Sequence, residues 1–176
     1  MSASGQDRIV ELPELRDRLG VFRDRADAGR VLADMLAPLP GGPAMVLAVP
    51  AGGVPVAAVI ARRLDLPLGL AVVSKITPSW SSEVGYGAVA WDGTVQLNQD
   101  VLPAMGVSER EIREDTARTV EKVRRRAAAL RGESPMPDLA GRTAILVDDG
   151  LASGFTMQVA VQAVRNAGGQ RIVVAV

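Results

Sequence analysis

The sequence contains no cysteine and no histidine. These absences exclude disulfides, thiol catalysis, zinc sites built on Cys or His, and acid–base chemistry by an imidazole. Aromatic residues make up only 3% of the chain, so Val, Leu, Ile and Ala have to build the core. Charge is balanced at 20 basic and 20 acidic residues, and the lack of a basic excess argues against a dedicated nucleic-acid-binding protein.

Long hydrophobic runs and a signal peptide are also missing, so we expect a soluble, cytoplasmic protein with no membrane partner. The length of 176 residues suits one domain, and a hydrophobic content of 48% is typical of a folded globular chain. We divide it into an N-terminal segment, residues 1–21, and a core, residues 22–176. The segment has apolar residues at a helix-like spacing that Pro13 interrupts, and they could pack on a sheet edge or on a partner subunit: Ile9, Leu12, Leu15 and Leu19.

Residues 144–157 are the most informative stretch of the sequence. An apolar run, residues 144–147, has no polar alternation and predicts a parallel strand buried on both faces. Two acids and a turn of small residues, 150–154, follow, and a helical pattern then covers residues 156–167. Small residues let the backbone approach a ligand, and the first N–H groups of the helix favour a phosphate in the turn.

The two acids, Asp148 and Asp149, stand where ligands bind in open α/β sheets, at the carboxyl end of a strand. An ionised Asp only accepts hydrogen bonds, so its natural partners are hydroxyl groups or a hydrated cation. Together with the hydroxyls of Ser153 and Thr156, the stretch predicts a receptor for a sugar phosphate with a free diol. A P-loop is excluded because the sequence has no Gly-Lys-Ser/Thr triplet.

A second strand–turn–helix unit comes earlier in the chain. A strand over residues 45–49 leads into the turn Pro-Ala-Gly-Gly-Val-Pro, residues 50–55, and a helix over residues 56–64, which could form a second anion site. Further strands are predicted over residues 68–74 and 171–176, the last of them buried, with a hairpin around Asp92-Gly93. Alternating strands and helices favour a doubly wound α/β sheet.

Capping residues mark the other helices. Asp24 is a candidate N-cap for a helix ending near Leu36. Ser108 and Glu111 form a candidate capping box before the helix with the strongest pattern in the sequence, and Val107 with Ile112 forms a hydrophobic staple. The predicted apolar face of that helix contains Ile112, Val120, Val123, Ala127 and Leu130.

Residues 145–157 resemble the ribose-phosphate-binding signature of the type I phosphoribosyltransferases, and the resemblance extends over residues 22–176. It implies a doubly wound, mostly parallel sheet flanked by helices, with the hairpin as an insertion. It also implies that Asp148 and Asp149 hold the ribose hydroxyls. The 5′-phosphate would bind Gly150, Ala152, Ser153, Gly154, Phe155 and Thr156, and pyrophosphate would bind Ala51, Gly52, Gly53 and Lys75.

The activity implied by the resemblance is that of an enzyme of nucleotide metabolism. It would bind 5-phosphoribosyl 1-pyrophosphate with Mg²⁺ and transfer the ribosyl phosphate to a nitrogenous base, releasing pyrophosphate. The metal would be held mainly by ligand oxygens and water, so no metal-binding residue is assigned. The catalytic residues would be Asp148, Asp149 and Glu83, the last in a closing loop over residues 76–87. Such enzymes are commonly dimers, and we expect a homodimer.

The sequence departs from the family pattern in several places. Ala51 stands where relatives usually carry Lys or Arg, and Ser74 stands where some have a second basic residue before Lys75. No hood segment follows the last strand, so the hood is either missing or supplied by residues 1–21. Ala152 replaces the Asp typical of 6-oxopurine salvage, which counts against hypoxanthine or guanine. Two alternatives stay open: a non-catalytic regulatory module that binds the same sugar phosphate, and a phosphosugar hydrolase.

Overall fold

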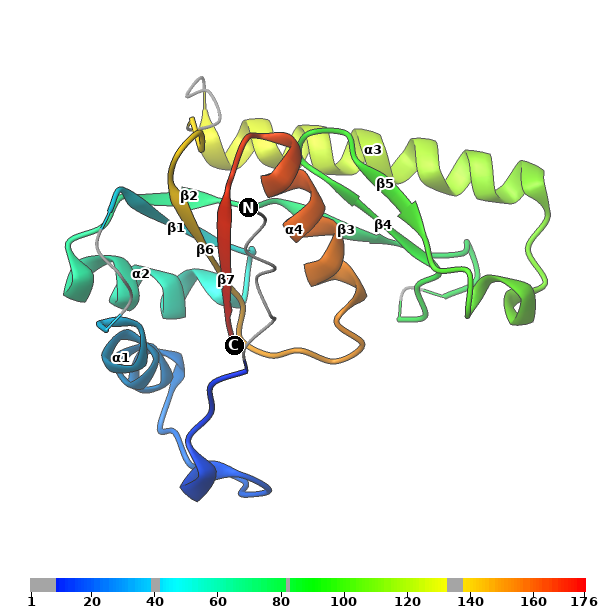
Figure 1. Ribbon diagram of the computed structural model, residues 1–176. Helices are drawn as coiled ribbons and strands as arrows, with labels where there is room; N and C mark the ends of the chain where they lie inside the picture. The colour runs from blue at the N-terminus through cyan, green and yellow to red at the C-terminus, as the bar shows by residue number, and fades with distance from the viewer. Residues whose placement is uncertain (1–8, 39–41, 82, 133–137) are drawn as a thin grey trace, which may run out of the picture.

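The computed structural model describes residues 9–38, 42–81, 83–132 and 138–176 (Figure 1). Its centre is a four-stranded sheet in the order β2–β1–β6–β7. All of its pairs are parallel, and β1 pairs with β6 from Ala44↔Thr143 to Ala48↔Val147, so the carboxyl ends of these strands lie side by side. The strands are β1 (Ala44–Ala48), β2 (Leu68–Leu70), β6 (Thr143–Val147) and β7 (Arg171–Ala175).

Helices cover both faces of the parallel sheet (Figure 1). Val46 and Ile145 point to one face and pack with α1 (Arg25–Leu36) and α2 (Gly53–Leu64). Leu47 and Leu146 point to the other face and pack with α4 (Phe155–Asn166). This burial on two faces is the reason why β1 and β6 are continuous apolar runs. It confirms the predicted doubly wound α/β fold.

A second, antiparallel sheet carries the predicted hairpin. It has the order β3–β4–β5, with β3 (Val73–Ile76), β4 (Gly87–Ala90) and β5 (Val95–Leu97). Asp92 stabilises the turn by accepting a hydrogen bond from the Thr94 backbone N–H at 2.9 Å. The long helix α3 (Glu109–Arg131) packs against one face through Val123, and α4 lies against the other. The small sheet therefore sits between α3 and α4.

Three predicted elements of the core, residues 22–176, differ from the structure. Residues 68–74 do not form one strand: β2 ends at Leu70, and the buried Ala71 and Val72 carry the chain into the second sheet. The last strand is not fully buried, because β7 lies at the edge of the sheet and Val174 is 40% exposed. Helix α2 begins at Gly53, three residues earlier than expected, so the glycine turn runs directly into it.

The capping predictions are confirmed. Asp24 accepts a hydrogen bond from the Asp27 backbone N–H at 2.8 Å and caps α1, and the Ser108–Glu111 capping box is present at the start of α3. The predicted apolar face of α3 is only partly buried, since Val120 and Leu130 are exposed.

The N-terminal segment does not form the helix suggested by its spacing. Its only helical element in residues 9–24 is a short, exposed 3-10 helix over Pro13–Leu15. Across the described parts of the chain, no helix is both long and apolar enough to cross a membrane.

Candidate functional site

A cavity of about 420 Å³ opens at the carboxyl ends of β1 and β6. It brings together the two strand–turn–helix units, the end of β3 and one residue of α3. Of the sequence-predicted site residues, it collects Lys75, Asp148 and most of the phosphate turn. The lining residues are Val49, Pro50, Val73, Ser74, Lys75, Thr77, Lys122, Asp148, Gly150, Leu151, Ala152, Ser153, Gly154, Thr156 and Met157.

The turn between β6 and α4 is open to solvent. Gly150, Ala152 and Ser153 are exposed and border the cavity, as do Gly154 and Thr156. Gly154 caps α4 with φ +74°, in the left-handed region that favours glycine, and no side chain caps this helix. The Phe155 backbone N–H donates to Ser153 Oγ at 3.4 Å, and the N–H groups that follow it in the first turn are available to a ligand, where the helix dipole favours an anion. Phe155 does not line the cavity but packs against the core.

The two acids face different surroundings. Asp148 lines the cavity and is half-buried, and its Oδ1 accepts a hydrogen bond from the Asp149 backbone N–H at 2.9 Å. Burial raises the pKa of the Asp148 carboxyl, and the negative charge of Asp149 adds to the effect. The Asp148 carboxylate can therefore accept further hydrogen bonds from a ligand in the cavity.

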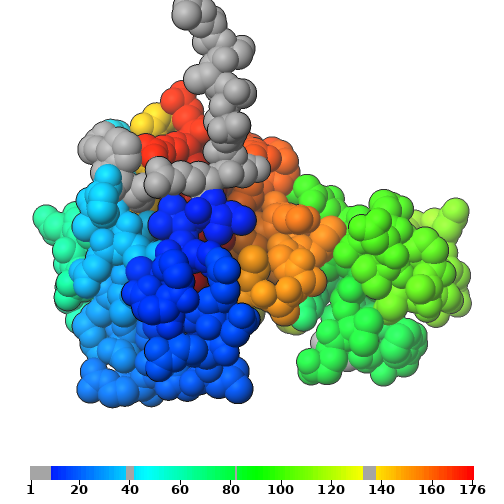
Figure 2. Space-filling model, turned by 60° about the horizontal axis from the view of Figure 1, so that its bottom comes forward, coloured from blue at the N-terminus to red at the C-terminus, as the bar shows by residue number. Residues whose placement is uncertain are grey.

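Asp149 is bound to α1 instead. Arg25 donates from Nε and from one terminal nitrogen to Asp149 Oδ2, at 2.8 and 2.5 Å. This interaction lowers the pKa of the Asp149 carboxyl and keeps it ionised. Figure 2 shows the N-terminal part of the described chain, in blue, beside the segment of the β6–α4 turn, in orange. The Asp149 side chain is not part of the cavity lining.

The turn between β1 and α2 packs against both acids. A Cβ on Gly52 would lie 2.3 Å from the carboxyl atoms of Asp149, and one on Gly53 would lie 2.3 Å from the Val147 carbonyl oxygen. Only residues without a side chain fit at such distances. Pro50, whose peptide bond to Ala51 is cis, borders the cavity, whereas Ala51, Gly52 and Gly53 do not. This turn therefore forms the support of the acid pair.

Both cations of the cavity come from outside the two turns. Lys75 lies within β3 of the antiparallel sheet, not directly after a strand of the parallel sheet as the prediction for residues 68–74 placed it, and Lys122 lies on α3. Sequence reasoning missed Lys122, because α3 has the charge pattern of a solvated helix. One signal could have found it: Lys75 and Lys122 are the only two lysines among 20 basic residues.

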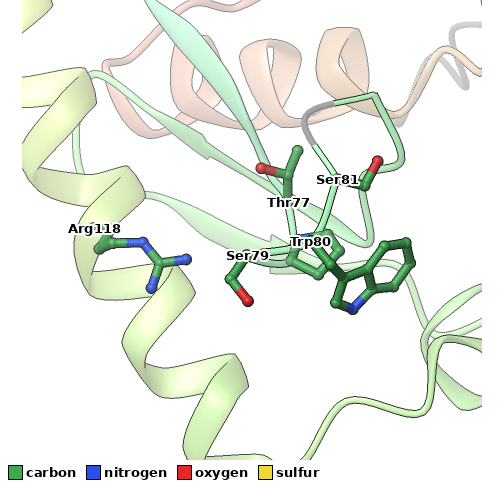
Figure 3. Close-up of a pocket in the computed structure, with 6 residues that line it drawn as sticks. Thr77, Ser79, Trp80, Ser81 and Arg118 are labelled. Carbon is green, nitrogen blue, oxygen red and sulfur yellow. The ribbon is translucent and has the colours of Figure 1, made fainter.

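The loop between β3 and β4 lies beside the cavity and forms a second hollow of about 430 Å³ with Arg118 of α3 (Figure 3). Trp80 lines this hollow and is 64% exposed. Tyr86 is fully buried, and its hydroxyl donates to Asp115 Oδ2 at 2.7 Å, which anchors the end of the loop to α3. Burial and the Asp115 carboxylate raise the pKa of Tyr86. Glu83 is exposed and borders neither hollow.

The family model described as "Phosphoribosyl transferase domain" matches residues 25–176, from the first residue of α1 to the end of β7. The chain belongs to the phosphoribosyl transferase family. The match contains both glycine turns, the acid pair and both cavity lysines.

Relatives within the phosphoribosyl transferase family cover most of the chain. It is 40% identical over 163 residues to "Putative phosphoribosyl transferase Rv0571c" of Mycobacterium tuberculosis (strain ATCC 25618 / H37Rv), covering 89% of this chain and 35% of that protein. The chain thus spans about a third of the length of this curated relative.

Solved structures share the fold. TT1426 from Thermus thermophilus is 37% identical, with a TM-score of 0.69 and coverage of 87% of this chain and 73% of that one. The purine phosphoribosyltransferase from Pyrococcus horikoshii Ot3 is 18% identical, with a TM-score of 0.50 and coverage of 85% and 69%, and shows likeness of fold alone.

Proposed function

We propose that the chain binds 5-phosphoribosyl 1-pyrophosphate with Mg²⁺ and transfers the ribosyl phosphate to a nitrogenous base, releasing pyrophosphate. One observation carries the proposal: a single cavity is lined by a half-buried carboxylate, an open helix-capping turn and both lysines of the chain. A ribosyl ligand with phosphoryl groups at both ends offers a hydroxyl donor and two anionic groups to such a lining.

The 5′-phosphate fits the turn between β6 and α4. This turn offers backbone N–H groups at the positive end of α4 and the hydroxyl groups of Ser153 and Thr156. Its small, exposed residues leave the backbone accessible, and binding there requires no cation from the turn itself.

The ribose diol is the natural partner of Asp148. An ionised carboxylate accepts hydrogen bonds from hydroxyl groups, and these bonds would favour the ionised form that burial disfavours. Loss of pyrophosphate leaves positive character at C1 of the ribose. A carboxylate held close to the sugar stabilises that developing charge before the base nitrogen attacks. Asp149 lies outside the cavity lining and is paired with Arg25, so Asp148 is the carboxylate that would meet the sugar.

The residues of the cavity suit a Mg²⁺ ion that binds together with 5-phosphoribosyl 1-pyrophosphate. No group of three His, Cys, Asp or Glu side chains that could hold a metal ion occurs in residues 9–38, 42–81, 83–132 and 138–176. Mg²⁺ is commonly bound through one or two carboxylates, phosphate oxygens and water, and Asp148 can supply a carboxylate from the cavity lining. When bound, the metal would neutralise charge on the departing pyrophosphate, a task that Lys75 shares from the protein side.

A second function is favoured by two specific observations. The β1–α2 turn has Ala51 and no cation of its own, and Glu83, the residue predicted as the base, borders neither hollow. A non-catalytic module that binds the same sugar phosphate and regulates a partner would need neither group. Binding is common to both proposals, and turnover separates them.

Pyrophosphate release is the test. Wild-type protein, 5-phosphoribosyl 1-pyrophosphate and Mg²⁺ are incubated with a panel of purine, pyrimidine and pyridine bases. We expect release that depends on one class of base. D148N should abolish it, whereas D100N, a variant of an acid outside the cavity lining, should not. Binding without release for any base would favour the regulatory module. Release without a base, with formation of ribose 5-phosphate, would indicate a hydrolase.

A further inference from the structure

The two lysines of the chain differ from its arginines in where they lie. Only two of its 20 basic residues are lysines, and both line the cavity at the end of the parallel sheet. No arginine in the part of the chain that the structure describes lines it. Lys75 and Lys122 are 47 positions apart in the sequence and come from a strand and a helix that pack against each other. The fold therefore brings both ammonium groups to one cavity from separate elements.

Lys122 has an unfavourable position on its own helix. Its neighbours at four residues' distance are Arg118 and Arg126, both cations, and its neighbours at three residues are Thr119 and Arg125. Like charges at this spacing destabilise a helix. Other cations of α3 have acidic partners along the helix: Arg110 pairs with Glu114, Arg113 with Glu109, and Arg125 with Glu121. Within the described residues, neither cavity lysine forms an ion pair.

The phosphate turn and the lysines offer different chemistry. The turn at residues 150–154 has N–H and hydroxyl donors for one phosphate, and the turn at residues 50–53 contributes no cation. The remaining negative charge of a ribosyl diphosphate ligand would then lie against Lys75 and Lys122. Lysine suits this task, because its ammonium group is a compact charge with three donors on a flexible stem, and it can follow a diphosphate that leaves.

We infer that Lys122, together with Lys75, binds the diphosphate group of the ligand and supplies the cation that the β1–α2 turn lacks. This inference rests on the proposed function and adds to it a residue of α3 that binds the leaving group. Lys122 is thus a ligand-binding residue rather than part of a solvated helix face.

Calorimetry with two ligands tests the inference. 5-Phosphoribosyl 1-pyrophosphate and ribose 5-phosphate share the ribose and the 5′-phosphate, and only the first has the diphosphate. With Mg²⁺ constant, K122Q should weaken binding of the first ligand about tenfold or more, and of ribose 5-phosphate less than about threefold. K75Q should show the same difference, and K122R should retain most of the affinity because it keeps the charge.

R124Q is the matched control. It removes one exposed positive charge from the same helix, two residues from Lys122, without changing the cavity lining. It should bind both ligands like the wild type. Wild-type affinity for both ligands in K122Q would overturn the inference, as would an equal loss for both ligands in a folded K122Q protein. A wild-type protein that binds neither ligand would instead refute the proposed function.

Discussion

The two strand–turn–helix units of the parallel sheet look alike in sequence and differ in use. Each has a five-residue buried strand and a 12-residue helix, joined by a turn rich in small residues. The β1–α2 turn is packed tightly against the acid pair, whereas the β6–α4 turn stands open at the cavity. The first turn therefore shapes and supports the site, and the second is available to a ligand.

The glycines show this difference most clearly. Gly53 leaves no room for a side chain, because its added Cβ would overlap the Val147 carbonyl oxygen and the Asp148 Cα. No atom of the described residues lies within 4 Å of such a Cβ at Gly150, and Gly154 is restricted by its backbone conformation rather than by its neighbours. A glycine-rich turn after a strand can thus be needed for close packing, for access or for conformation. The following predictions separate these uses.

The largest effect is expected for the tight turn. G53A should destabilise the protein by about 2–3 kcal/mol, because backbone atoms of β6 have to shift to admit the methyl group. G150A should change stability by less than about 0.5 kcal/mol, since its methyl group enters open space. Urea unfolding of the two variants compares them directly. Equal stability of G53A and G150A would contradict the close packing of the first turn against the acids.

The next effect concerns binding at the open turn. D148N should weaken 5-phosphoribosyl 1-pyrophosphate binding by about 1.5–3 kcal/mol, since it removes a charged acceptor. The same variant should be no less stable than the wild type at pH 7, because the raised pKa means that ionised Asp148 disfavours folding above that pKa. Calorimetry and urea unfolding give the two values. Unchanged affinity would exclude Asp148 from the ligand site.

A smaller effect should follow from conformation alone. G154A places a Cβ on a residue with φ +74°, and the nearest atom to it is 3.9 Å away. The expected loss of stability is about 1 kcal/mol, and G154N should lose less because Asn tolerates the left-handed region better. Thermal unfolding of both variants tests this order. A G154A protein as stable as the wild type would show that the turn adopts another conformation.

The smallest effect depends on pH. Asp149 has a pKa lowered by Arg25, so its contribution to stability is complete above the usual value of 3.8 and disappears as the pH falls through the lowered pKa. D149N should therefore cost at most about 1 kcal/mol at pH 7, because the ion pair is partly exposed, and progressively less below pH 4. R25Q should show the same trend in urea unfolding. A loss independent of pH in both variants would argue against this ion pair.

Strong local signals in the sequence made much of the fold predictable. The apolar run at residues 144–147 and the capping residues Asp24 and Ser108 are such signals, and the structure has β6, α1 and α3 at these places. The switch between sheets at Ala71 and Val72 was not predictable, because both residues are buried and apolar like their neighbours in the strands. Residues buried within one sheet and residues buried where the chain passes between two sheets are both apolar, so the sequence does not distinguish them.

The part of the site that lies in one continuous segment was predictable from the sequence. The phosphate turn and Asp148 belong to one continuous motif, and both line the cavity with Lys75. The ion pair between Arg25 and Asp149 joins residues 124 positions apart, and the position of Lys122 depends on how α3 packs against β3. Both are contacts between residues far apart in the sequence, and such contacts produce no periodic pattern from which they could be predicted. The assignment of Glu83 as a base stays a prediction.

A crystal structure with 5-phosphoribosyl 1-pyrophosphate and Mg²⁺ tests the central claim most directly. We predict the 5′-phosphate against residues 152–156, a ribose hydroxyl on Asp148 and the diphosphate near Lys75 and Lys122. A ligand bound outside the cavity, or one whose ribose contacts neither acid, would contradict the account.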